Sequence, residues 1–112
     1  MIRFKSSVVI QYFNRRLARV FEAASIWSEL TRIGVDVNAV TDGQHKPGSL
    51  HYFSLAVDLD TEGDRRQDLM SLHAWLARHL EAGYDVVFEE DHVHVEYDSH
   101  RTTPLTAAGP VR

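Results

Sequence analysis

Hydrophobic residues recur along the chain with two different periods, one typical of helices and one typical of strands. From Asn14 onward, apolar residues return every three or four positions, which predicts a helix with Asn14 as its N-cap and Gly34 as its stop. A second helix is predicted over residues 62–80, with acidic residues in its first turn and Gly83 shortly after it. The apolar stripes that face the core are Leu17, Val20, Phe21, Ala24, Trp27 and Leu30 on the first helix, and Leu69, Leu72, Leu76 and Leu80 on the second.

Strict alternation of apolar and polar residues predicts the strands. It covers residues 35–40, 55–59, 84–89 and 92–97, whereas residues 1–13 indicate a short edge strand or an extended arm. Turn chemistry ends the first alternating run at residues 41–43, and a tight connection through Glu90 and Asp91 predicts a β-hairpin. The order strand, helix, strand, loop, strand, helix, hairpin predicts an α+β fold: a mainly antiparallel sheet with two principal helices packed on one side.

Composition limits the domain organisation and the classes of partner. The 112 residues, of which 44% are hydrophobic, suffice for one core, so we expect a single domain over residues 1–98. Residues 99–112 hold almost no large apolar side chain and are predicted to be a disordered tail. The net charge of −4, without clustered basic residues, argues against nucleic acid as a partner. We expect a monomer.

The chain also lacks the sequence signals of membrane insertion and export. No apolar run approaches the roughly 18 to 20 residues of a membrane helix, so no membrane partner is expected. The N-terminus does not have the charged-then-apolar pattern of a signal peptide. We therefore expect a protein that is cytoplasmic as synthesised.

Histidine and carboxylate residues supply the candidate chemistry. The chain has seven histidines and no cysteine, so any metal site must use imidazole and carboxylate ligands. His51 and Asp58 stand seven positions apart, and alternation places His92, His94 and Glu96 on one face of a strand. We predict that the fold brings these stretches together around one Zn²⁺ ion on the sheet. The spacing also allows a solvated strand face without a metal, or a site in which His92 and His94 are both ligands.

Two motifs resemble those of a known enzyme family. Ser49, His51, Ala56 and Asp58 match the Ser-x-His-x-x-Gly-x-Ala-x-Asp motif of the zinc D-alanyl-D-alanine carboxypeptidase and L-alanyl-D-glutamate peptidase family, which includes phage endolysins. Residues 91–94, Asp-His-Val-His, resemble the second motif of that family and of its wider clan, which also holds murein endopeptidases and the zinc domain of hedgehog proteins. The likeness spans roughly residues 35–97.

The resemblance implies a set of roles for individual residues. The zinc ligands would be His51, Asp58 and His94, and the general base would be Asp91 or His92. Glu96 would orient an imidazole as an outer acceptor. Contacts to the substrate or to the oxyanion are expected from His45, Lys46, Ser49 and Tyr52.

The implied activity is zinc-dependent hydrolysis of an amide bond in peptidoglycan stem peptides, of the D-Ala-D-Ala or L-Ala-D-Glu type, by a phage- or prophage-encoded enzyme. Without a signal sequence, such an enzyme would need holin-type release to reach the cell wall. Three positions depart from the motif: Ser54 replaces the family's Gly, Asp91 stands where the family usually has Glu, and residues 41–46 contain no Arg. These departures favour an alternative, a zinc-containing phage domain that binds cell-wall peptide with little or no turnover.

Overall fold

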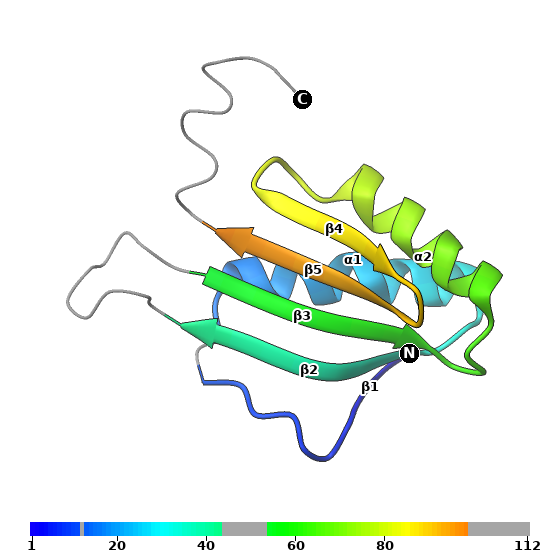
Figure 1. Ribbon diagram of the computed structural model, residues 1–112, viewed down its shortest axis with the longest axis horizontal. Coiled ribbons are helices and arrows are strands. Elements are labelled where there is room, and N and C mark those ends of the chain that lie inside the picture. The colour runs from blue at the N-terminus through cyan, green and yellow to red at the C-terminus, as the bar shows by residue number, and fades with distance from the viewer. Residues whose placement is uncertain (12, 44–53, 99–112) are drawn as a thin grey trace.

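The alternating segments form one five-stranded mixed sheet in the computed structural model, which describes residues 1–11, 13–43 and 54–98 (Figure 1). The strands lie in the order β1-β2-β3-β5-β4. Strands β1 and β2 are parallel, and the other three neighbouring pairs are antiparallel. The strand bounds are β1 Ile2–Phe4, β2 Val35–Gly43, β3 Ser54–Thr61, β4 Tyr84–Glu89 and β5 His92–Asp98.

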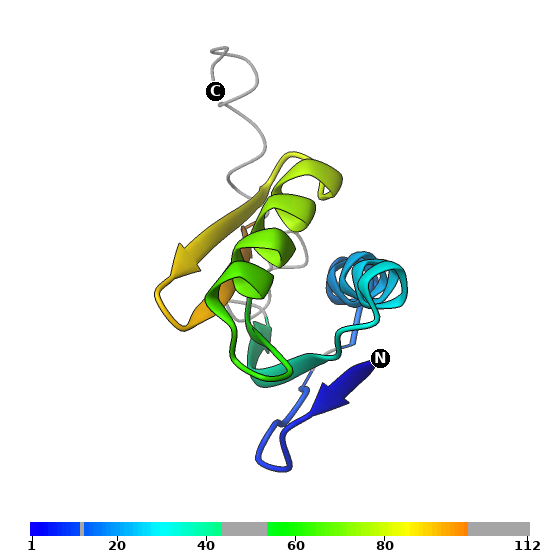
Figure 2. The ribbon, with the colours of Figure 1, turned by 90° about the vertical axis from the view of Figure 1, so that its right-hand side faces the viewer.

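Two helices, α1 (Arg15–Thr31) and α2 (Arg66–His79), pack on the same side of this sheet. Figure 2 shows the sheet curving around that side, and neither of these helices lies over its other face. The predicted α+β fold, with both principal helices on one side, is therefore confirmed. The predicted hairpin is also confirmed, because β4 pairs with β5 from Glu89 opposite His92 to Tyr84 opposite Tyr97.

Helix α1 begins as the sequence predicts. The side chain of Asn14 accepts hydrogen bonds from the backbone N–H groups of Arg16 and Leu17, at 2.8 and 3.1 Å. These two donors belong to the first turn and have no partner within the helix, so the Asn14 amide oxygen satisfies them. The predicted N-cap is confirmed.

The end of α1 differs from the prediction, because Gly34 is not its stop. The helix ends at Thr31, and Arg32 takes the left-handed conformation with φ 67° and donates its N–H to the carbonyl of Ser28. Gly34 instead lies against Glu62: its N–H donates to Glu62 Oε1 at 2.8 Å, and a Cβ at this position would lie 2.6 Å from that oxygen. The glycine lets the Glu62 carboxylate approach the backbone, and a larger residue would have to displace the end of that flexible side chain.

Two other predicted boundaries shift. Strand β2 runs through residues 41–43, where the sequence predicts a turn, because these residues pair with residues 54–56 of β3. Helix α2 begins at Arg66 rather than at residue 62. Gly63 and Asp64 have φ values of 86° and 53°, and this left-handed backbone forms a turn between β3 and the helix.

The core lies between the sheet and the two helices. Alternation places Leu55, Val57 and Leu59 of β3 on the covered face, with at most 2% of each exposed. Facing positions on β2, β5 and both helices complete the cluster: Leu17, Val20, Ala23, Ala24, Trp27, Val35, Val37, Leu69, Leu72, Leu76, Leu80, Val93, Val95 and Tyr97. Burial of this apolar surface fixes which residues of each strand are left on the opposite face.

Candidate metal centre

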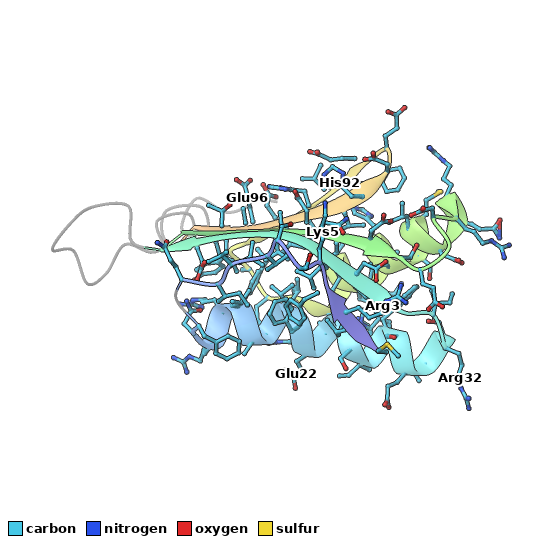
Figure 3. The ribbon with its side chains drawn as sticks, turned by 90° about the horizontal axis from the view of Figure 1, so that it is seen from below. Arg3, Lys5, Glu22, Arg32, His92 and Glu96 are labelled. Carbon is cyan, nitrogen blue, oxygen red and sulfur yellow. The ribbon has the colours of Figure 1, made fainter. Side chains whose placement is uncertain are left out.

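The face of the sheet opposite α1 and α2 carries the described histidines and carboxylates of the predicted site. Figure 3 shows His92 and Glu96 on this face, on the side of the sheet opposite to Glu22 and Arg32 of the α1 region. We call it the open face. Its residues are set by cross-strand register: Asp58 of β3 lies directly opposite His94 of β5, and Glu89 of β4 directly opposite His92. The register therefore brings together side chains from three strands.

Asp58 and His94 form the shortest described polar contact between these side chains. His94 Nδ1 lies 2.6 Å from Asp58 Oδ1, and because an ionised carboxylate can only accept, the imidazole N–H is the donor. The side chains of Asp58 and His94 are 32% and 26% exposed, so each is partly accessible to solvent. Their backbones are fixed by pairing within the sheet. A pair of oxygen and nitrogen donors at a rigid position is a suitable start for a cation site.

His92 has carboxylates at both of its ring nitrogens. Its Nδ1 lies 2.8 Å from Asp91 Oδ1, while its Nε2 lies 3.3 Å from Glu89 Oε1 and 3.7 Å from Asp58 Oδ1. The Nε2 side of the ring therefore points toward the Asp58–His94 pair. The Nδ1 side points to the hairpin turn.

This arrangement changes the protonation of His92 and Asp91. The hydrogen bond to Asp91 raises the pKa of His92 above its ordinary value, and the charges of Asp58, Asp91 and Glu89 act in the same direction, against partial desolvation. The same hydrogen bond lowers the pKa of the Asp91 carboxyl. Both shifts have the same cause, because the hydrogen bond favours the pair of an imidazolium and a carboxylate.

Within the described ranges, Asp58, His92 and His94 could hold a metal ion. Each offers one ligand atom, and these three atoms lie within 4.8 Å of one another. Two imidazole nitrogens and one carboxylate oxygen are the donor types of catalytic zinc sites, in which ligands about 2.0 to 2.2 Å from the metal lie roughly 3.3 Å apart. The separation of 3.7 Å between His92 Nε2 and Asp58 Oδ1 is close to that spacing. The donor types and this separation therefore fit zinc, whereas Asp58 Oδ1 and His94 Nδ1 are hydrogen-bonded at 2.6 Å, closer than two ligands of one ion.

The structure describes two of the three predicted ligands, Asp58 and His94. Asp58 and His94 lie side by side as expected, and His92 joins them. Five predicted site residues lie outside the described ranges, and their roles stay predictions: His45, Lys46, Ser49, His51 and Tyr52.

The predicted roles of Glu96 and Asp91 can be compared with the distances from their carboxylates to the histidine rings. Glu96 Oε2 is 4.0 Å from His94 Nε2, longer than a hydrogen bond, so its role as an acceptor stays a prediction. Asp91 contacts His92 but does not belong to the group of three candidate ligands. Its side chain is 91% exposed.

Glu89 is not among the predicted site residues, but its Oε1 lies 3.3 Å from His92 Nε2. The predicted hairpin could have identified Glu89, because a two-residue connection through Glu90 and Asp91 sets Glu89 directly opposite His92. Further acidic residues share the open face: Asp36 lies opposite Asp60 across β2 and β3, and desolvation raises the pKa of Asp60 to about 6. Asp36 is paired with Arg3, whose Nε lies 2.7 Å from Asp36 Oδ1. Glu89 is therefore the acidic residue that adds negative charge next to His92.

Comparison with known protein families gives a match over most of the chain. A sequence profile of the hedgehog amino-terminal signalling domain matches residues 8–98, a range that includes both helices and all three candidate ligands. No solved structure matches the chain at a significant level. Neither helix in the described part of the chain has the length and apolar composition needed to cross a bilayer.

Proposed function

Because this chain belongs to the family of the hedgehog amino-terminal signalling domain, whose clan includes zinc peptidases, we propose that it is a zinc-dependent peptidase. Its substrate, in this proposal, is an amide bond in peptidoglycan stem peptides, of the D-Ala-D-Ala or L-Ala-D-Glu type. The family membership confirms the predicted clan. The narrower carboxypeptidase family, the phage or prophage origin and the cell-wall substrate are parts of the proposal that rest on the two sequence motifs.

One observation carries the proposal: the donor atoms of Asp58, His92 and His94 converge within 4.8 Å on an otherwise ordinary sheet. Register thus presents one carboxylate oxygen and two imidazole nitrogens at a single place on the sheet, where a cation could bind all three. The donor set favours zinc over magnesium or calcium, which prefer oxygen ligands alone.

The proposal allows two ligand sets. In the first, His51 from the segment before β3 joins Asp58 and His94, and His92 carries protons. In the second, His92 is itself the third ligand. A His92→Ala variant separates them, because loss of a ligand abolishes zinc affinity whereas loss of a proton carrier lowers turnover and spares affinity.

The roles of the chain's own residues follow from their contacts. Asp58 and His94 would hold the ion, and a zinc ion at such a site supplies Lewis acidity that brings the pKa of a water molecule to about 7. In the first ligand set, His92 Nε2, 3.7 Å from Asp58, would accept the proton that the attacking water loses and would pass it to the leaving amine. Glu89, 3.3 Å from the same nitrogen, stabilises the imidazolium between these two transfers.

The test combines zinc analysis with amine release. We expect the purified protein to bind about one zinc ion per chain and to release amine from peptidoglycan stem peptides or D-amino-acid dipeptides. Asp58→Ala should lose both properties. Val87→Ala is the matched control, because Val87 lies directly opposite His94 on the open face and has no ligand atom. If zinc-loaded wild-type protein released no more amine than Asp58→Ala, hydrolysis would be ruled out.

A second candidate function keeps the metal and omits catalysis. The matching profile describes a signalling domain, and Ser54 and residues 41–46 depart from the peptidase motif. Both observations favour a zinc-containing domain that binds cell-wall peptide. Calorimetry that detects binding of a stem peptide, together with no amine release over hours, would support this candidate over the peptidase.

A further inference from the structure

The ring of His92 has a different set of neighbours at each nitrogen. Asp91 is the partner at Nδ1, at 2.8 Å, and the candidate ligand Asp58 lies on the Nε2 side. A rotation of the ring by 180° about its bond to Cβ would move Nε2 away from Asp58. The contact at Nδ1 therefore decides which nitrogen is available to the centre.

The hairpin turn holds Asp91 in place for this contact. Only Glu90 and Asp91 connect Glu89 to its cross-strand partner His92, and Glu90 has φ 35°, a backbone conformation rarely adopted by residues other than glycine. Non-glycine residues in this region persist where the surrounding structure requires them, and they concentrate at functional sites. The tight turn fixes the backbone of Asp91 next to His92, and the 2.8 Å hydrogen bond joins their side chains.

We propose that Asp91 is a positioning residue that fixes the His92 ring through Nδ1, so that Nε2 serves the Asp58–His94 centre. This inference deepens the proposed function, on which it rests for the role of the centre. It also replaces one of the two roles expected from the sequence. Asp91 stands at the motif position of the general base, but its oxygen accepts a hydrogen bond from His92, and it lies outside the group of candidate ligands.

The inference applies to both ligand sets. Whether His92 binds the ion or carries a proton, the reacting nitrogen is Nε2. The ring proton must then be on Nδ1, where Asp91 accepts it in a hydrogen bond. A carboxylate that accepts the N–H of a metal-site histidine typically contributes 10- to 100-fold to metal affinity or activity. Asp91 is placed to supply that effect.

The experiment measures the tautomer of His92 by long-range ¹⁵N–¹H correlation NMR of the metal-free full chain, at a pH at which the ring is neutral. We expect the Nδ1–H form in wild-type protein and a shift toward the Nε2–H form in Asp91→Ala. Asp91→Asn should restore the wild-type pattern, because its amide oxygen accepts the same hydrogen bond. Glu90→Gln is the matched control, since it removes one charge from the neighbouring turn position.

Activity of the zinc-loaded protein gives a second, separate readout. Asp91→Ala should lower kcat or zinc affinity about 10- to 100-fold, and Asp91→Asn should recover part of the loss. An unchanged His92 tautomer in Asp91→Ala would overturn the inference, even if wild-type protein hydrolyses peptide. Conversely, the His92 tautomer could depend on Asp91 in a protein that shows no turnover. That pair of results would refute hydrolysis and support the positioning role. Unchanged β5 amide resonances verify the fold in every variant.

Discussion

The two faces of the same sheet differ in almost every physical property. On the face covered by α1 and α2, residues such as Val57, Leu59 and Val95 are fully buried hydrocarbon. On the open face, the neighbouring residues Asp58 and His94 are polar and about 30% exposed. One position along a strand thus separates core from site. Because side chains alternate between the faces, the residues that stabilise the fold and the candidate ligands occupy alternate positions of the same strand.

Different interactions stabilise the side chains on the two faces. Leu59 lies between Val37 and Val93 in the sheet, so its stabilisation comes from many weak contacts with hydrocarbon. Asp58 interacts with a few named atoms on β5, and its partial exposure limits the energy of each contact. Substitutions on the two faces should therefore affect different measurements.

The largest expected effect on folding is on the covered face. Leu59→Ala should lower the free energy of unfolding by about 2 to 5 kcal/mol, because it leaves a cavity at a fully buried position. Asp58→Ala, one position away, should change the stability of the metal-free protein by less than about 1 kcal/mol. Urea unfolding of both variants measures the difference. Equal losses would show that the two faces do not divide stability and chemistry.

Zinc should stabilise the protein through the open face alone. At a free concentration about 100 times Kd, zinc should raise the free energy of unfolding by about 2.7 kcal/mol, because it binds only the folded arrangement of ligands. Thermal unfolding with and without a chelator measures the effect. Asp58→Ala should show none of this stabilisation, whereas Val87→Ala should retain it. A zinc effect of the same size in Asp58→Ala would contradict the candidate centre.

Tyr84 tests the edge of the covered face. Its hydroxyl donates to the carbonyl of Arg16 at 2.8 Å, so Tyr84→Phe should cost about 1 kcal/mol near neutral pH. Burial raises the pKa of Tyr84 to about 12 from the ordinary value of 10.0, so the folded state favours the neutral phenol. This contribution is complete below pH 10 and is lost as the pH rises through 12.

Urea unfolding between pH 8 and about 12 checks the Tyr84 prediction, with the range set by these pKa values. Wild-type protein should lose stability over the upper part of this range, and Tyr84→Phe should lose less. Parallel curves for the two proteins would show that Tyr84 is not the group responsible.

The smallest expected effect is at the turn that ends the open face. Glu90→Gly should raise stability by about 0.5 to 1 kcal/mol, because glycine adopts the φ of 35° found at this position without steric cost. Val87→Gly, in the extended part of the same hairpin, should lower stability and serves as the control. Denaturant midpoints measure both changes. A loss of stability in Glu90→Gly would mean that its side chain contributes more than its backbone conformation costs.

The sequence predicted the fold where local patterns and tertiary packing agree. Asn14 was identified as an N-cap from its position before an apolar stripe, and the structure confirms it. Gly34 was misassigned, because a glycine after a helix usually ends it, and only the approach of Glu62, far along the chain, reveals its role. The extension of β2 to Gly43 was likewise missed, since its partner residues on β3 override the local turn chemistry.

By itself, the sequence determined which residues of each strand share a face, because side chains alternate with a period of two whatever the strand pairs with. It therefore placed His92, His94 and Glu96 together. Only the tertiary structure decided that Asp58 lies beside His94, that Glu89 reaches His92, and that Asp91 contacts the far nitrogen of that ring. Those contacts depend on the order and register of β3, β5 and β4, which burial of the opposite face selects.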